Sequence, residues 1–296
     1  MTGVKKTGAD KLFDHINRIF LLTSMLIVLL PLIHVIAKSL SSSGEVISGH
    51  VFLWPKQFTL AAYKEILASK MLLIGYRNSF IYTIAGTVTN IFFTVICAYP
   101  LSRSDFRGRK QLMWIFVFTM IFSAPLIPTY LNISRLNMLD TIWAMILPNA
   151  INVYNMVVAR TFFVNSIPVE MLEAAGLDGA DDFKIIRHIV LPLSKSILAV
   201  LVLFYAVGHW NSYFDAYIYL SSEDKLPLQV ILRNILANAK MVEQMANASV
   251  DQTERLAMVE VLKYAIIVFG SIPVIILYPF VQKHFVKGVM IGSLKG

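Results

Sequence analysis

Long apolar stretches alternate with short polar segments along this chain. Six stretches contain no Asp, Glu, Lys or Arg, and each is close to the ~20 residues that an α-helix needs to cross ~30 Å of hydrocarbon. They are Ile19–Ile36, Asn78–Leu101, Leu112–Leu131, Thr141–Val158, Ile197–Phe214 and Tyr264–Val281. We therefore predict an all-α polytopic membrane protein with six transmembrane helices in one domain, residues 19–286.

Prolines lie in several of the predicted spanning helices. Each removes a backbone hydrogen bond and permits a kink, which suits helices that line a cavity or move as a gate. Proline is also more frequent in membrane helices than in soluble ones, which explains any single proline equally well. The residues are Pro31, Pro125, Pro128, Pro148 and Pro273.

The composition agrees with a membrane location. The chain is 57% apolar and 15% charged, whereas soluble domains carry ~25% charged residues. The net charge of +8 suggests nucleic-acid binding at first, but the basic residues follow the predicted topology instead. With a cytoplasmic N-terminus, fifteen of the 26 Lys and Arg residues lie in inside segments, four of them in the loop 102–111. We predict that both termini are cytoplasmic.

This topology gives each connecting segment a side of the membrane. We expect cytoplasmic residues at 1–18, at 160–195 and in the tail 287–296, and extracytoplasmic residues at 37–77 and 215–263. In the last segment, Leu228–Ala237 and Asp251–Val261 have apolar residues at helical spacing. We predict that they form short helices along the outer face, too short to span the membrane.

Residue types that carry chemistry are scarce. The single cysteine, Cys97, lies inside the second apolar stretch, where packing is its default role. His34 and His188 have no nearby partners in sequence, so we assign them neither a metal nor a catalytic function. We expect no catalytic residue, metal or cofactor. The first apolar stretch follows basic residues and lacks a small-residue cleavage site, so we expect it to remain as a helix.

The segment Glu173–Pro192 is polar and rich in small residues, although it lies between long apolar stretches. Pro168 suits the first turn of a helix. The small residues of this helix present a surface with little side chain, which admits a close partner. Gly179 then bends the chain, and a second helix begins at Asp181 and Asp182. Its apolar face is formed by Phe183, Ile186 and Val190, and it ends at Leu191–Pro192. Composition alone also allows a surface connector without a partner.

The spacing of residues in this segment resembles a family motif. It resembles the EAA motif of the membrane subunits of ATP-binding cassette importers. The matching pattern is Glu173-Ala174-Ala175, a gap of three residues, Gly179, a gap of nine residues, Ile189, a gap of one residue, and Leu191-Pro192. In that family the segment forms the coupling helix, which sits in a groove of the cytoplasmic ATPase and converts its closure into motion of the spanning helices. The resemblance implies this role for Glu173, Ala174, Ala175, Asp178, Gly179 and Ala180.

The energy source is expected on another polypeptide. No GxxxxGK[ST] phosphate-binding loop occurs in the sequence, so we expect ATP hydrolysis on a separate partner chain and a transport role, not an enzymatic one, for this chain. Three further segments resemble carbohydrate-importer permeases of the maltose-transport class: Ala124–Leu147, Trp210–Tyr213 and the tail 287–296. The tail most resembles the branch of that class that serves oligosaccharides and polysaccharide fragments. This resemblance implies a heterodimer with a second permease subunit, a cytoplasmic ATP-binding subunit dimer, an extracytoplasmic solute-binding protein and a sugar substrate.

Polar residues in the predicted spanning helices are candidates for the substrate pathway, because buried amides tend to face a bundle interior or a water-filled path. Asn149, Asn152 and Asn155 follow Pro148 at three-residue spacing, along one side of the fourth helix. In the fifth helix, Trp210, Asn211 and Tyr213 lie close to His209 and Asp215 and offer aromatic faces and hydrogen-bonding groups for sugar rings. An interfacial aromatic belt is the alternative explanation.

The second helix has a polar face that helix packing explains well enough. Thr83, Thr87, Asn90 and Thr94 recur at spacings of three and four, with Gly86 nearby. Contact of this face with substrate is the less favoured alternative.

Other functional classes predict features that the sequence lacks. A permease for another solute, such as a peptide or a phosphorus-containing anion, is the closest alternative, but an anion path predicts Arg or Lys within the helices. An ion-coupled secondary transporter predicts acidic residues there, and the six stretches contain neither. A membrane enzyme needs paired carboxylates, a His cluster or an activated nucleophile, whereas the acidic residues lie in loops or at helix ends.

Overall fold

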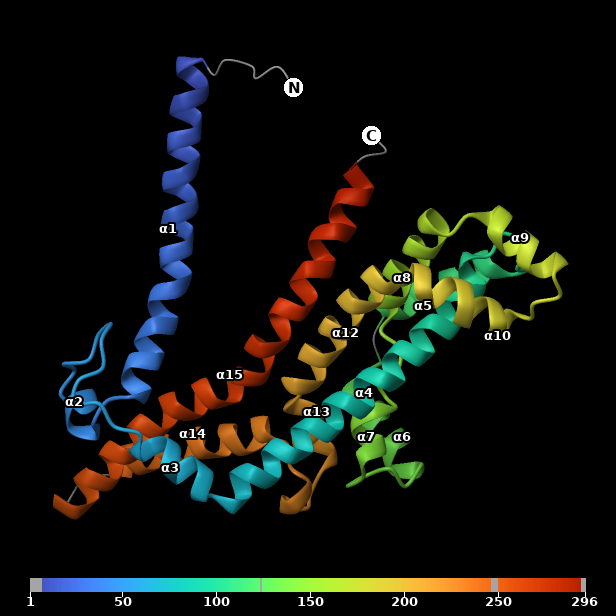
Figure 1. Cartoon of the computed structure of the whole chain (residues 1–296). Helices are drawn as coiled ribbons and strands as arrows, with labels where there is room; N and C mark the ends of the chain where they lie inside the picture. The colour runs from blue at the N-terminus through green and yellow to red at the C-terminus, as the bar shows by residue number, and fades with distance from the viewer. Residues whose placement is uncertain (1–6, 123, 246–249, 294–296) are drawn as a thin grey trace. The chain divides into compact units, whose positions relative to one another are not determined.

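The structure, a computed structural model, describes residues 7–122, 124–245 and 250–293, and these ranges contain helices but no strand. Three helices are long: α1 (Gly8–Ser39), α4 (Lys70–Ser102) and α15 (Val250–Ser293) (Figure 1). The all-α prediction is confirmed. The shorter elements are α2 (Ser43–Ile47), α3 (Ala61–Ala68), α5 (Arg109–Ile121), α6 (Leu126–Arg135), α7 (Ile142–Ile146), α8 (Val153–Ser166), α9 (Val169–Leu177), α10 (Asp182–Ile185), the π-helix η1 (Ile186–Val190), α11 (Leu191–Leu193), α12 (Lys195–Trp210), α13 (Phe214–Tyr219), the 3-10 helix η2 (Glu223–Lys225) and α14 (Leu228–Met245).

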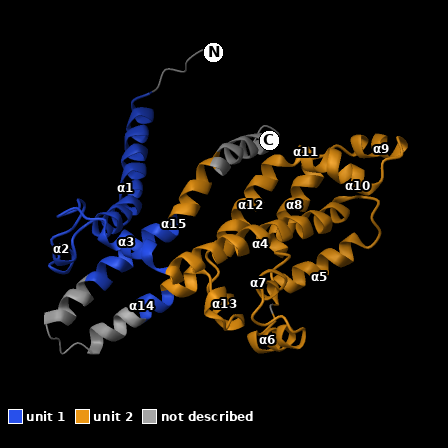
Figure 2. Ribbon diagram, turned by 60° about the horizontal axis from the view of Figure 1, so that its bottom comes forward, with its two compact units in different colours: residues 1–69, 233–271 blue, residues 70–232, 272–296 orange. Residues whose placement is uncertain are grey.

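Contacts group the chain into two compact units (Figure 2). Unit 1 comprises residues 1–69 and 233–271, and unit 2 comprises residues 70–232 and 272–296. Within unit 1, the Lys38 ammonium donates a hydrogen bond of 3.2 Å to the Tyr264 hydroxyl and lies 4.8 Å from the centre of its ring. This contact joins the end of α1 to α15. Both predicted functional regions belong to unit 2.

Only some of the predicted spanning stretches are single helices. In the described residues, Gly8–Ser39, Lys70–Ser102 and Met258–Pro279 are long and apolar enough to cross a membrane, and two bent helix pairs bring the total to at most five. The first, second and sixth predicted stretches lie in these long helices. The count of six spans and the cytoplasmic termini remain predictions.

The third, fourth and fifth stretches are not single helices from end to end, and two of the prolines expected to permit kinks, Pro125 and Pro148, lie at the breaks of the third and fourth. The third is divided between α5 and α6, with Pro125 as the N-cap of α6. The fourth is divided between α7 and α8 around Pro148, which lacks the N–H that would continue α7. The fifth ends its helix at Trp210, and α13 begins only at Phe214.

The two predicted short helices had different outcomes. Leu228–Ala237 forms the first part of α14, which continues to Met245. Asp251–Val261 is not a separate helix, because α15 runs without a break from Val250 to Ser293. No proline or glycine separates Val261 from the apolar stretch that follows, so nothing ends the helix there.

Helix α4 packs against α12 through the polar face that the sequence identified. The Thr94 and Tyr205 hydroxyls share a buried hydrogen bond of 2.7 Å. The His209 Nε2 atom lies 2.6 Å from the Asn90 Oδ1 atom. Gly86 makes room for His209, because a Cβ atom at position 86 would overlap the imidazole ring. Helix packing is therefore confirmed as a role of Asn90 and Thr94.

The first half of α4 also holds the η2 turn. The Asn78 amide donates to the carbonyl of Asp224 at 2.7 Å. The Tyr82 hydroxyl donates to the carbonyl of Lys225 at 2.8 Å, and the Ser79 hydroxyl accepts from the amide of the residue that starts α14. These bonds give hydrogen-bond partners to backbone groups of the turn that are not paired within a regular helix.

Asp140 fixes the same turn from the opposite side. Its carboxylate accepts hydrogen bonds from the Ser221 and Ser222 amides, both at 3.0 Å, and from the Ser222 hydroxyl at 2.6 Å. The Lys225 ammonium lies 2.7 Å from the carboxylate and also donates to the Asp140 carbonyl. The Lys225 ammonium, followed by the Ser222 hydroxyl and amide, holds the pKa of the Asp140 carboxyl well below its usual range.

We expect Gly86→Ala to destabilise the protein by about 1–3 kcal/mol, because the added methyl group forces His209 away from Asn90. Thermal unfolding of the purified chain in detergent measures this loss. Gly208→Ala on α12 is the control, because nothing lies within 4 Å of its added Cβ, and a helical Gly→Ala change with room is neutral or favourable. An equal loss in both variants would contradict the close contact of α4 with α12.

We expect Asp140→Asn to lower the stability by about 1–2 kcal/mol at neutral pH, because charge-assisted hydrogen bonds are lost. Asparagine tolerates the positive φ of 57° at this position. Since the folded pKa of Asp140 is depressed, its contribution is complete above the unfolded value of about 3.9 and decreases as the pH falls below it. The difference in unfolding midpoint should therefore be constant from about pH 8 to 6 and shrink in acid.

Asp105→Asn is the matched control for that experiment. Asp105 pairs with Arg103 at 2.7 Å, but its side chain is 65% exposed. An exposed pair contributes less than about 1 kcal/mol. A loss at Asp105 equal to that at Asp140 would show that the η2 turn is not specially stabilised.

Candidate coupling segment and substrate pathway

The first half of the predicted coupling segment forms α9. Pro168 is its N-cap, Glu170 lies in its first turn, and Leu172 is buried against the core. Ala175 is partly buried against the same core. The helix ends at Leu177, and Figure 1 shows α9 and α10 near the C-terminal end of α4.

The six predicted coupling residues therefore divide into two groups. Glu173, Ala174, Asp178 and Gly179 are exposed, whereas Ala175 and Ala180 pack against the core. The exposed group forms a surface of small and acidic residues on one side of the turn.

Gly179 has a conformation that other residues rarely adopt. Its φ is +76°, in the left-handed region that favours glycine, and no atom lies within 4 Å of a Cβ added there. The glycine is thus required by the backbone of the turn rather than by lack of space. The prediction that Gly179 bends the chain between two helices is confirmed.

An apolar residue beside the small-residue surface escaped the sequence analysis. Leu177 is 90% exposed and lies four residues after Glu173, which puts both on the same face of α9. Leu177 therefore adds an exposed apolar side chain to a surface that is otherwise small and polar. The i, i+4 spacing from Glu173 is the signal that could have identified it.

The second helix of the segment packs back on the core through Ile186 and Val190, as predicted, but not through Phe183. Asp181 caps it, accepting a 2.7 Å hydrogen bond from the Lys184 amide. Ile185 and Val190 are buried, whereas Phe183 is 77% exposed, so its assignment to the packing face was wrong. The π-helix η1 accounts for the change, because it brings residues five apart, such as Ile185 and Val190, onto one face. The helix also passes Pro192 and ends at Leu193.

The predicted pathway residues on the fourth stretch do not share one helical face. Asn149 lies in the non-helical linker between α7 and α8, where its side-chain amide donates a 2.8 Å hydrogen bond to the Asp215 carboxylate. Asn152 caps α8, accepting from the Asn155 amide at 3.0 Å. Asn155 itself is buried. The break at Pro148 explains the difference, since the three-residue spacing was projected on a continuous helix.

The linker is anchored to α4 by its backbone. The Asn90 side-chain amide donates to the Asn149 carbonyl, while the Asn90 oxygen faces His209 Nε2. Because an amide oxygen only accepts, Nε2 of His209 carries the hydrogen in this arrangement. A continuous series of polar groups therefore connects α12, α4, the linker and Asp215.

The predicted residues at the end of the fifth stretch have three different environments. Trp210 is 3% exposed and makes edge contacts with Tyr76 and Phe80, at ring distances of 5.5 and 5.2 Å. Asn211 donates to the Val207 carbonyl at 3.0 Å and caps α12. Tyr213 is exposed. The structure thus brings Asn149 to Asp215 but does not gather all six predicted residues around one site.

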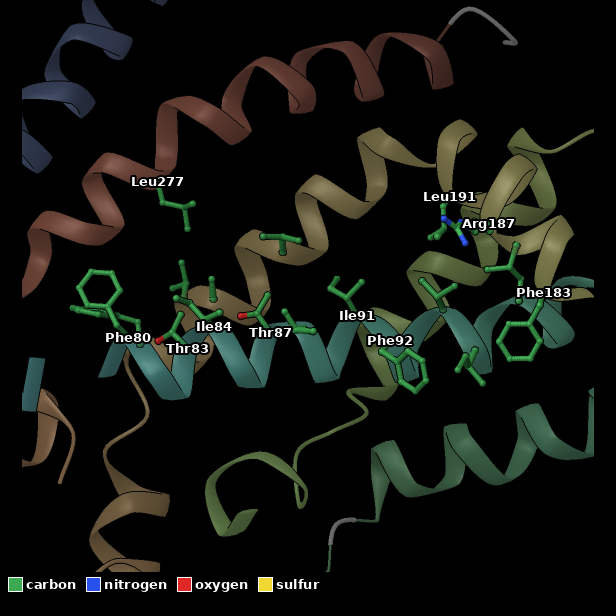
Figure 3. A pocket seen from close by; sticks show the side chains of 18 of the residues that line it. Phe80, Thr83, Ile84, Thr87, Ile91, Phe92, Phe183, Arg187, Leu191 and Leu277 are labelled. Carbon is green, nitrogen blue, oxygen red and sulfur yellow. The ribbon is translucent and has the colours of Figure 1, made fainter. Parts of the chain in front are cut away.

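Unit 2 also contains a large apolar cavity of about 1230 Å³ between α4, η1, α12 and the later part of α15 (Figure 3). Of the six predicted pathway residues, Trp210 alone lines it. Figure 3 shows Thr83 and Thr87 along α4 and Leu277 on the opposite wall. Within the described residues, the Thr83 and Thr87 hydroxyls are buried without a hydrogen-bond partner. The described residues contain no group of three His, Cys, Asp or Glu suited to a metal ion.

Comparison with known proteins places this arrangement in a family. The chain is 42% identical over 291 residues to the polygalacturonan/rhamnogalacturonan transport system permease protein YtcP of Bacillus subtilis, covering 97% of this chain and 99% of that protein. It is 39% identical over 294 residues to the protein LplC of the same organism, covering 98% and 97%.

A solved structure has the same fold over nearly the whole chain. It is the crystal structure of a bacterial ABC transporter involved in the import of the acidic polysaccharide alginate, with a TM-score of 0.85, 36% identity, and coverage of 96% of this chain and 100% of that chain. Residues 72–291 match the family described as binding-protein-dependent transport system inner membrane component. The chain therefore belongs to this family of inner-membrane transport components.

Proposed function

We propose that this chain is the permease subunit of an ATP-driven importer that carries fragments of acidic polysaccharides. The observation that carries the coupling role is the exposed turn at Gly179, where α9 presents Glu173, Ala174 and Asp178 and the following helix packs back on the core. Such a turn combines an open docking surface with rigid attachment to the helix bundle.

The similarity of the chain to two transporters supports the substrate class. One relative is named for polygalacturonan and rhamnogalacturonan transport, and the similar structure belongs to an importer of the acidic polysaccharide alginate. The six apolar stretches contain no Lys or Arg. We therefore infer that selection for the negative charge resides in a solute-binding protein, while this chain contributes amides and hydroxyls that pair with sugar hydroxyl groups.

Four groups are proposed for contact with the sugar in this pathway. Asn149 and Asp215 form an accessible amide and carboxylate pair at the α7–α8 linker. Asn211 and Tyr213, which lie close to Asp215 in the sequence, are exposed. Asn152, Asn155 and Trp210 are instead proposed as supporting residues, since they cap α8 or are buried. Carbohydrate sites use this mixture of aromatic faces and hydrogen-bonding groups.

The proposed complex contains further chains. Because the sequence has no phosphate-binding loop, hydrolysis of ATP is assigned to a separate cytoplasmic ATP-binding subunit dimer. A different second permease subunit completes the pathway, and an extracytoplasmic solute-binding protein delivers the sugar. Residues 1–18 and 287–296 are proposed as cytoplasmic segments, with residues 1–6 and 294–296 outside the described part of the chain.

We expect the chain, reconstituted in liposomes with these partners, to accumulate labelled oligogalacturonide only when ATP is supplied. A neutral oligosaccharide of equal length should compete poorly, because the proposed substrate is acidic. Measurement of uptake with and without ATP, and with an ionophore, checks this. Uptake that needs an ion gradient but no ATP would support a secondary transporter, and preference for a peptide would support the other-solute alternative.

We expect Gly179→Ala to lower transport by about fivefold or more, because a left-handed alanine costs at least about 1 kcal/mol and the turn must rearrange. ATP binding by the assembled complex should remain. Gly108→Ala is a matched control, since Gly108 also has a positive φ, +84°, and no atom within 4 Å of an added Cβ. Equal loss of transport in both variants would contradict a specific role of the Gly179 turn.

A further inference from the structure

The buried end of α4 makes a polar contact with the coupling segment. Tyr99 is 3% exposed, and its ring packs in the core with Ile185 and Val190. Its hydroxyl donates a 3.0 Å hydrogen bond to the Oδ1 atom of Asp182, the first residue of α10. A buried tyrosine needs such a partner for its hydroxyl, so ring and hydroxyl together fix the second helix of the segment against α4.

A second bond joins the same end of α4 to the helix before the coupling segment. The Arg160 Nε atom on α8 donates to the carbonyl of Leu101 at 2.8 Å. Helix α9 begins shortly after α8 ends at Ser166. The C-terminal turn of α4 is therefore attached both to α8, which leads into the segment, and to α10, the second helix within it.

The same helix reaches the candidate pathway farther along its length. Asn90 holds the carbonyl of Asn149 in the α7–α8 linker and faces His209 on α12. Nine residues separate Asn90 from Tyr99, which is about 14 Å of α-helix. No residue between them departs from the helix, so a displacement at Tyr99 moves Asn90 as part of one rigid element.

We propose that Tyr99 is a positioning residue for coupling: its hydrogen bond to Asp182 passes movement of the coupling segment to α4, and Asn90 passes it to the linker at residues 147–152. This inference rests on the proposed function, because it assumes that a partner ATPase moves the segment. Tyr99 touches neither nucleotide nor sugar in this role. It differs from the docking residues of α9 because it acts inside the bundle, after docking has occurred.

The test is Tyr99→Phe in the complete complex, reconstituted in liposomes and supplied with labelled oligogalacturonide. The substitution removes the hydroxyl but keeps the ring in the core. We expect ATP hydrolysis within about twofold of the unsubstituted complex, and a fall of about fivefold or more in sugar transported per ATP hydrolysed. A fall in the amount of sugar transported per ATP, without a fall in the rate of ATP hydrolysis, distinguishes broken coupling from failed assembly.

Tyr82→Phe is the matched control for loss of a buried tyrosine hydroxyl. Tyr82 lies on the same helix, is 6% exposed, and donates to the Lys225 carbonyl at 2.8 Å, far from the coupling segment. We expect its transport-to-ATP ratio to be unchanged. Thermal unfolding of both variants compares how much stability each one loses.

Substitutions of the acceptor complete the experiment. Asp182→Asn keeps the Oδ1 acceptor and should retain coupling, whereas Asp182→Ala should behave like Tyr99→Phe. The double variant Tyr99→Phe/Asp182→Ala should be no worse than either single change, because the two remove one interaction.

Three outcomes would overturn the inference. The first is an unchanged ratio in Tyr99→Phe, and the second is an equal fall in Tyr82→Phe; both leave the proposed function intact if the unsubstituted complex transports sugar with ATP. The third is absence of ATP-driven uptake in the unsubstituted complex, which overturns the proposed function and this inference with it.

Discussion

The arrangement of unit 2 depends on how α4 pairs the polar side chains that it carries into an apolar interior. An amide left without a partner in such surroundings costs several kcal/mol. Asn90 avoids this cost by bonding to two elements at once, the Asn149 carbonyl and His209. Asn78 and Tyr82 avoid it by bonding to backbone carbonyls of the η2 turn. Helices that could slide along apolar contacts are thereby held in one register.

The sequence predicted well the features that are encoded locally. Apolar length identified α1, α4 and α15, and small residues with a central glycine identified the turn at Gly179. The polar face of α4 was also recognised as a packing surface, since Asn90 and Thr94 recur at helical spacing. In these cases a few neighbouring residues determine the structure, so a pattern along the chain is sufficient.

The features that depend on distant residues or on helix irregularity could not be predicted in the same way. An apolar stretch reports how much hydrocarbon it can occupy but not whether the helix is continuous. Pro125 and Pro148 were identified as positions that permit kinks, but full breaks there and the end of α12 at Trp210 were not predicted. The pairing of Asn149 with Asp215 joins residues 66 positions apart. The π-helix moved Phe183 off the packing face, and no simple periodicity anticipates an extra residue in a turn.

The contact between Gly86 and His209 has a consequence for the substitutions that α4 and α12 can accept. Because a Cβ at position 86 would overlap the imidazole ring, a larger residue there requires His209 to move or a smaller residue at position 209, and either change gives up the bond to Asn90. The two positions are therefore coupled, so that a change at one restricts the residues that the other can accept. Divergence of the pathway is in this way constrained by the space between two helices as well as by the chemistry of the transported sugar.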